Sequence, residues 1–134
     1  MSIKTIIIDG KNFSTLKTFY EEIDRVLTKD LDWKTGHNLD ALNDIFRGGF
    51  GVTEYKEPII LIWKNISKSK NDLGIKATQR FYKIKICTDK YNISNVKHWK
   101  VKLKELFHKN GKTLFSIIVE IIKENEHIEF KFEN

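Results

Sequence analysis

The sequence contains few of the residues that crosslink a chain or interrupt regular structure. Its 134 residues include one cysteine, one proline, seven glycines and four histidines. A single cysteine, Cys87, excludes a disulfide within the chain, and histidines without accompanying cysteines give no zinc signature. The scarcity of proline and glycine argues against a disordered or low-complexity chain. Cys87 lies in an alternating apolar run, so we expect a small core residue and not a nucleophile.

Long apolar runs are also missing. The first residues, Met-Ser-Ile-Lys, contain no hydrophobic signal region. No stretch approaches the roughly 20 consecutive apolar residues that a transmembrane helix needs. We therefore expect a cytoplasmic protein without a membrane anchor. An apolar content of 40%, with nine Phe and three Trp, is sufficient for a single globular domain over residues 1–134.

The formal net charge of +6 is unevenly distributed along the chain. Residues 1–63 carry eight basic and ten acidic side chains, and residues 113–134 carry two and five. Residues 64–112 carry 14 basic side chains against three acidic ones, a net charge of +11. An acidic body therefore contains one strongly basic middle segment.

Three short runs predict β-strands. Lys4–Asp9 is a β-branched run that ends in an Asp-Gly turn. Residues 58–63 are apolar throughout, which suits a central strand covered on both faces, as in a parallel sheet. Ile128–Phe132 alternates strictly between apolar and charged residues, so it predicts a strand with one exposed face.

Helical periodicity separates these strands. Residues 14–29 carry an apolar stripe with Ser14 as a candidate N-cap and with most of the charged residues, Glu22 among them, outside it. Residues 38–46 and 113–125 show the same period, and residues 65–74 suit a short helix or turn. This order predicts an α/β fold in which a three-stranded parallel sheet is flanked by helices.

Residues 36–44 (Gly-His-Asn-Leu-Asp-Ala-Leu-Asn-Asp) stand out within this pattern. Asn38 is a candidate N-cap, and Asp40 and Asp44 share one helix face because they are four residues apart. Two like charges at that spacing repel by a few tenths of a kcal/mol. The pair benefits the protein only if a basic partner meets it; the simpler alternative is a solvated acidic face.

The pattern Gly-x-Asn-Leu-Asp-Ala-Leu-x-Asp resembles the barstar family of intracellular inhibitors of bacterial ribonucleases. Here it follows a helix and precedes glycines and a buried strand, and the resemblance covers residues 3–73 and 113–132. It implies an immunity protein that blocks a ribonuclease toxin, with no catalysis and no cofactor of its own. In barstars, carboxylates on the acidic helix occupy the place of the substrate phosphates.

The resemblance also assigns roles to residues. Asp44 matches the aspartate that reaches deepest into the ribonuclease, and Asp40 matches its companion. Glu120 matches a further acidic contact by spacing alone. Family members carry aromatic residues where this chain has Lys34 and Asn43, so Trp33, His37 or Phe50 could compensate, and the partner could be a different toxin. The candidate partner-binding residues are Trp33, Lys34, Gly36, His37, Asn38, Asp40, Asn43, Asp44 and Glu120.

Residues 75–112 form an insertion for which a small barstar has almost no room. Residues 81–88 alternate between charged and apolar types, so part of the insertion is expected to be a strand. Residues 95–109 predict a basic helix. We expect both elements to pack beside the last helix.

The basic insertion allows three interpretations. Lys97, Lys100 and Lys104 could touch an acidic patch on the toxin. Alternatively, the insertion could bind RNA directly, with aromatic side chains stacking on the bases. A solvated lysine-rich face is the simplest alternative. We favour the toxin contact over RNA, because the acidic remainder would repel a phosphate backbone. The aromatic candidates for base stacking are Tyr82, Tyr91 and Trp99.

An enzymatic function finds little support in the sequence. Asp40, Asp44 and His37 could be regarded as an acid–base set or a metal site, but no third and fourth ligand occurs at a workable spacing. The glycines after residue 47 lack the preceding strand and the following Lys-Ser/Thr of a phosphate loop. We therefore expect an inhibitor and not an enzyme.

Overall fold

The computed structural model, which describes residues 3–108 and 111–134, contains a three-stranded parallel sheet in the order β1-β2-β3. The strands are β1 (Lys4–Asp9), β2 (Ile59–Lys64) and β3 (Ile128–Phe132). In the register of the sheet, Trp63 of the central strand pairs with Ile8 and Phe132. The predicted α/β fold class is confirmed.

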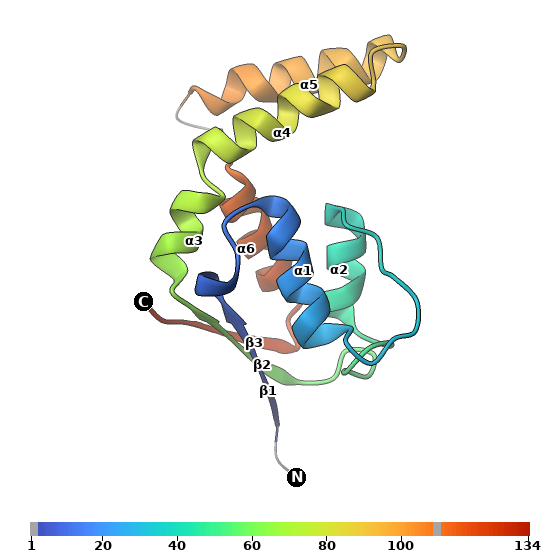
Figure 1. Cartoon of the computed structure of the whole chain (residues 1–134), viewed down its shortest axis with the longest axis vertical. Coiled ribbons are helices and arrows are strands. Elements are labelled where there is room, and N and C mark those ends of the chain that lie inside the picture. The colour runs from blue at the N-terminus through green and yellow to red at the C-terminus, as the bar shows by residue number, and fades with distance from the viewer. Residues whose placement is uncertain (1–2, 109–110) are drawn as a thin grey trace.

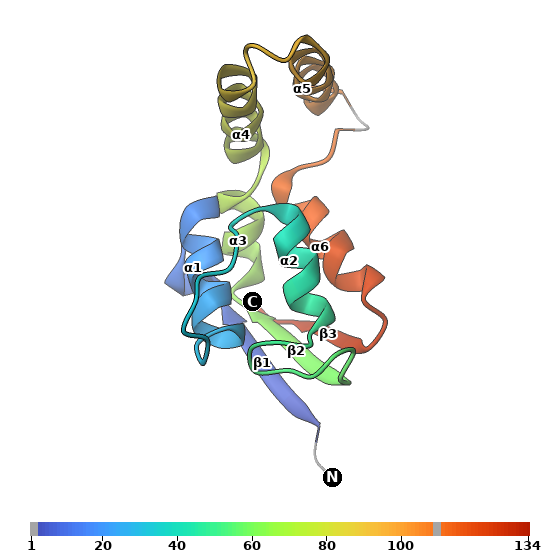
Figure 2. The same cartoon turned by 90° about the vertical axis from the view of Figure 1, so that its right-hand side faces the viewer.

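The helices lie on one side of this sheet (Figures 1 and 2). The central strand was expected to be covered on both faces, and this is wrong. Ile60 and Ile62, which point away from the helices, remain half-buried, whereas Leu61 is fully buried. The helical elements are η1 (Gly10–Asn12), α1 (Leu16–Leu27), α2 (Leu39–Arg47), α3 (Ile66–Asp72), α4 (Ile75–Thr88), α5 (Ile93–Leu106) and α6 (Leu114–Glu124). None of the described helices is long and apolar enough to cross a bilayer.

Hydrogen-bonding side chains set the starts of the main helices. Asn38 caps α2 as predicted, since its Oδ1 accepts a hydrogen bond from the Ala41 amide at 2.8 Å. The cap of α1 is Thr15, not Ser14, because Thr15 and Thr18 exchange the reciprocal bonds of a capping box. These local contacts fix where the chain turns into each helix.

Trp63 lies at the centre of the core and is fully buried. Its ring stacks on Phe19 of α1 at 5.8 Å between centroids and lies 5.5 Å from Phe115 of α6. The indole N–H donates to the hydroxyl of Ser69 in α3 at 2.9 Å, so the only polar atom of the side chain is satisfied. One side chain of the central strand thus joins three helices.

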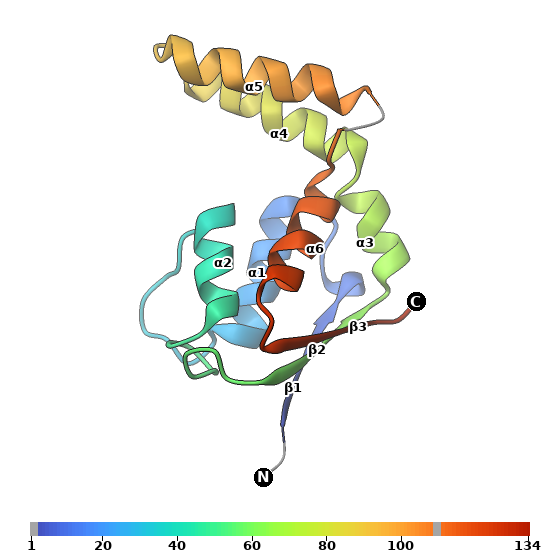
Figure 3. The same cartoon turned by 180° about the vertical axis from the view of Figure 1, so that it is seen from behind.

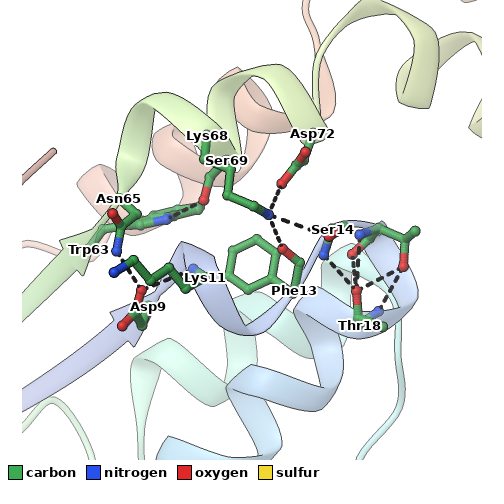
Figure 4. Close-up of polar contacts among 11 residues, drawn as sticks. Asp9, Lys11, Phe13, Ser14, Thr18, Trp63, Asn65, Lys68, Ser69 and Asp72 are labelled. Carbon is green, nitrogen blue, oxygen red and sulfur yellow. Dashed lines mark hydrogen bonds and ion pairs between the residues drawn. The ribbon is translucent and has the colours of Figure 1, made fainter.

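A second network closes the carboxyl edge of the sheet, where α/β proteins often bind ligands (Figure 4). Lys68 of α3 donates to the carbonyl of Phe13 at 2.6 Å and pairs with Asp72. Asn65 donates to Asp9 at 2.8 Å. Gly10 permits this close packing, because a Cβ there would lie 2.5 Å from the Ser69 hydroxyl. The chain's own side chains therefore fill this edge.

Glu22 of α1 was expected on the solvated side of the helix but is buried. Its carboxylate accepts hydrogen bonds from the Asp9 amide at 2.9 Å, from the Asn12 side chain at 3.0 Å and from Arg25 at 2.7 Å. Burial raises the pKa of Glu22, but the hydrogen bonds from Arg25, Asp9 and Asn12 outweigh it and hold the pKa below its ordinary value. The carboxylate links β1, η1 and α1.

The insertion forms a helical hairpin of α4 and α5 that projects from the body (Figures 1 and 3). The strand expected within residues 81–88 is wrong, because α4 runs from Ile75 to Thr88. The basic helix is confirmed as α5, which packs on α4 and not along α6. Lys109, at the end of the predicted helix, lies outside the described residues.

Aromatic contacts hold the hairpin together. Tyr82 of α4 stacks on Trp99 of α5 at 6.0 Å, and the indole N–H of Trp99 donates to Asp89 at 2.8 Å. Cys87 was expected in the core but is exposed, since it lies on the outer face of α4. The hairpin is joined to the body by Thr78, whose hydroxyl donates to the Gly74 carbonyl and accepts from the Leu114 amide of α6 at 2.8 Å.

We predict that Glu22→Ala lowers the free energy of unfolding by about 2 kcal/mol, because the Asp9 amide and the Asn12 side chain lose their buried acceptor. Since the folded pKa of Glu22 lies below the unfolded value, the contribution of its carboxylate is present above about pH 4.5 and is lost as the pH falls further. Urea unfolding between pH 7 and pH 3 tests both statements. The exposed neighbour provides the control: Glu21→Ala should change stability by less than about 0.5 kcal/mol, and an equal effect of the two variants would contradict the prediction.

Candidate protein-binding site

Helix α2 presents its two aspartates to solvent. Asp40 and Asp44 are both exposed, whereas Leu42, Ile45 and Phe46 on the other side of the helix are buried in the core. Because the apolar side is fixed, the orientation of the acidic side is fixed as well. Asp40 lies in the first turn, where the helix dipole stabilises its negative charge.

Among the described residues, Asp44 has one ionic partner. Arg47 Nη1 lies 3.2 Å from Asp44 Oδ1, and the Asp44 side chain remains 59% exposed. A pair this exposed contributes at most about 1 kcal/mol, because water screens it. A cation on a partner can therefore replace Arg47 at little cost.

The loop that leads into α2 is anchored to α1 by Asp24. Its two carboxylate oxygens contact the Thr35 hydroxyl at 2.9 Å and His37 Nε2 at 2.7 Å. The Thr28 hydroxyl donates to the same carboxylate at 3.1 Å. The His37 ring also stacks on Tyr20 of α1, with centroids 5.2 Å apart and planes 11° apart. These contacts hold the loop before the acidic helix in one conformation.

A groove of about 420 Å³ lies beside Asp44. Trp33 and Phe50 form part of its wall, with ring centroids 5.7 Å apart, and the Trp33 side chain is 54% exposed. Tyr55, which is 62% exposed, also lines it, together with Gly36 and Arg47. Three aromatic side chains thus line the same groove as the carboxylate that the sequence singled out.

The wall that carries Phe50 depends on glycine. Gly48 follows α2 with φ of 85°, and a Cβ there would lie 2.2 Å from the Glu54 carbonyl oxygen. The Val52 amide then donates to the Leu27 carbonyl at 2.9 Å, which ties the turn to the end of α1. The turn is therefore fixed by backbone contacts.

The other sequence-derived candidates have different environments. Asn43 is half-buried and accepts a hydrogen bond from Asn125 at 3.0 Å, so it joins α2 to the end of α6. Glu120 is exposed and pairs with Lys112 at 3.1 Å. Lys34 is exposed. Gly36 packs closely against the helix cap, because a Cβ there would lie 3.0 Å from the side-chain nitrogen Nδ2 of Asn38.

Asp24, Thr35, Arg47 and Tyr55 were not identified from the sequence. Asp24 precedes His37 by 13 residues, and no periodicity connects a helix position to a loop. Arg47 could have been found, since it lies three residues after Asp44 in the predicted helix. Among the described residues no group of three or more His, Cys, Asp or Glu side chains could hold a metal ion.

The geometry can now be compared with known proteins. The sequence model of one family, described as Barstar (barnase inhibitor), matches residues 3–131, which is nearly the whole chain and includes the hairpin. No curated protein matches the sequence. The match agrees with the parallel sheet, with the acidic helix and with the resemblance of residues 36–44. The chain belongs to the barstar family.

Proposed function

We propose that this protein inhibits a ribonuclease toxin by placing the acidic face of α2 over the enzyme's active site. The observation that carries the proposal is the position of Asp44, a solvent-exposed carboxylate on a rigid helix beside a groove lined by aromatic side chains. Aromatic side chains and a central charge are the features of energetically dominant contacts in protein interfaces.

The chemistry of inhibition is electrostatic and steric. A ribonuclease binds the phosphates of RNA with cationic side chains, and the Asp40 and Asp44 carboxylates present the same sign of charge to those cations. The inhibitor contributes no reacting group, because its function is to occupy the site. Preorganisation lowers the entropic cost of binding, and here the Asp24 contacts to Thr35 and His37 supply it.

Trp33, Phe50 and Tyr55 supply part of the aromatic surface that is lost where Lys34 and Asn43 stand in place of the family's aromatic residues. They line the groove from the loop before α2 and from the turn after it. Because these rings do not come from α2 itself, the apolar surroundings of the acidic site differ from the family pattern. This difference favours a toxin other than barnase as the partner.

The exposed lysines of α5 serve a second role in this proposal. Lys97, Lys100 and Lys104 lie at helical spacing on one side of α5 and are exposed. They attract an acidic patch on the toxin while α2 attracts its basic active site, so the two fields orient the approaching partner.

Direct RNA binding by the hairpin is less well supported than the sequence suggested. Tyr82 is only 5% exposed, and Trp99 packs against it inside the hairpin. Of the three aromatic side chains considered for stacking on bases, only Tyr91, at 90% exposure, is free to do so.

We predict that Asp44→Ala weakens the complex more than any other single substitution, by about 30-fold or 2 kcal/mol, with Asp40→Ala second. The probes are two ribonucleases, barnase and a candidate toxin domain chosen from the genes next to this one. Affinity is measured by calorimetry, and RNA cleavage is assayed with and without the inhibitor.

The matched control is Glu129→Ala on β3. The Glu129 side chain is 61% exposed and pairs with Lys131, much as the exposed Asp44 pairs with Arg47. This variant should bind within about twofold of the wild type. Equal affinity of the wild type and Asp44→Ala would refute the proposed binding face, and failure of both ribonucleases to bind would refute the proposed function.

We further predict that Asp24→Ala weakens binding about tenfold without removing a contact to the toxin, because the loop at residues 28–38 loses its anchor. Hydrogen exchange of the loop amides should accelerate in the free protein. In a double-mutant cycle, Asp24→Ala combined with His37→Ala should cost less than the sum of the two. Asp30→Ala, which removes an exposed carboxylate of the same loop, is the control; an effect as large as that of Asp24→Ala would contradict the anchoring role.

A further inference from the structure

A second cleft, of about 520 Å³, lies where the hairpin meets the body. Helix α1 and the loop before α2 form one wall, and α4 forms the other. The side chains that define it are Leu16, Tyr20, His37, Arg80, Phe81 and Ile84.

The walls of this cleft are apolar and its rim is cationic. Tyr20 is buried and Phe81 half-buried, whereas the Ile84 side chain remains 55% exposed at the mouth. Arg80 is largely solvent-accessible, and no ion pair holds it among the residues that the structure describes. Asp72, the acidic residue of the lining, pairs with Lys68. The cleft therefore suits an apolar side chain that is accompanied by a negative charge.

The loop before α2 connects this cleft to the acidic helix. His37 lines it and directly precedes Asn38, which caps α2 only two residues before Asp40. Two views show the hairpin projecting over the N-terminal end of α2, which follows the loop that contributes to the cleft (Figures 1 and 3). A protein that covers Asp40 would therefore also meet the underside of α4.

The hairpin is held firmly enough to act as a wall. Thr78, fully buried, ties α4 to the first residue of α6, and Tyr82 and Trp99 stack between the two hairpin helices. Lys85 lies 5.6 Å above the Phe81 ring, which keeps that side chain in place. The cleft is thus largely formed before any partner binds.

We propose that this cleft is the second half of the inhibitor's interface and receives a loop of the same ribonuclease. The loop would carry an aliphatic or aromatic side chain that enters between Tyr20 and Ile84, and an adjacent carboxylate that pairs with Arg80. This inference rests on the proposed function. It assigns the partner a basic active site next to an acidic, apolar loop.

The proposal also accounts for the changed apolar surroundings of α2. Where Lys34 and Asn43 replace aromatic anchors, buried contact area must come from elsewhere in the interface. An apolar side chain of the toxin that enters the cleft supplies that contact area, so the anchoring residue belongs to the toxin and not to the inhibitor. A toxin without such a loop would leave the cleft unfilled and bind with lower affinity, and this difference in affinity gives specificity.

The first test compares Ile84→Asp with Val101→Asp. The two side chains are 55% and 54% exposed on the hairpin, and each variant adds one negative charge, but Val101 lies outside the cleft. With the ribonuclease that binds the wild type, Ile84→Asp should raise Kd about tenfold, mainly through faster dissociation. Val101→Asp should stay within about twofold. Thermal unfolding of both variants confirms that each is folded.

The second test compares Arg80→Glu with Lys83→Glu, which reverses a charge on the same helix outside the cleft. Arg80→Glu should raise Kd at least tenfold and Lys83→Glu only about twofold, because Lys83 acts only through long-range attraction. Retention of each variant on immobilised RNA is measured alongside.

The outcomes separate the two proposals. If Asp44→Ala weakens the complex but Ile84→Asp behaves like Val101→Asp, the cleft proposal is overturned and the proposed function stands. If Arg80→Glu and Lys83→Glu both abolish RNA retention and leave the affinity for the ribonuclease unchanged, the hairpin is an RNA-binding element and the cleft proposal is again overturned. A selective loss in Ile84→Asp and Arg80→Glu supports it.

Discussion

The burial of one indole ring, that of Trp63, organises the whole molecule. The ring touches Phe19 of α1 and Phe115 of α6, and its N–H reaches Ser69 of α3. Since Trp63 belongs to the central strand, the helices are positioned with respect to the same point. Helices α1, α3 and α6 contact the ring, α2 and α4 pack on α6, and α5 packs on α4. A substitution that empties this volume would displace the acidic helix and the hairpin together, because core packing transmits strain.

The proposed binding surface combines exposed side chains with a scaffold that fixes their positions. Asp44 projects from a helix whose opposite side is buried, while Asp24 restrains the loop before that helix. The turn after the helix is restrained by backbone hydrogen bonds and by the left-handed conformation of Gly48. Binding energy is therefore available for the partner and is not spent on ordering the inhibitor.

Local signals in the sequence predicted much of this arrangement, and contacts between distant segments were missed. The cap at Asn38 and the strand at Ile128–Phe132 depend on neighbouring residues, so both could be predicted. Residues 81–88 of α4 were mistaken for a strand because charged and apolar residues alternate there, and the exposure of Ile84 leaves the apolar stripe of the helix incomplete. The hydrogen bond between Asp24 and His37 depends on the path of a loop, for which the sequence carries no periodic signal.

The hairpin makes most of its contacts within itself, and it meets the body chiefly at Thr78 and along the cleft walls. Its interactions are short in sequence separation, whereas those of β2 connect the two ends of the chain. Such a unit can have a free energy of unfolding of its own, so its stability is a property separate from that of the sheet. Its sequence is correspondingly free to diverge: in the proposed interface, replacing the hairpin residues that face the partner would change which toxin is recognised without requiring the core to be repacked.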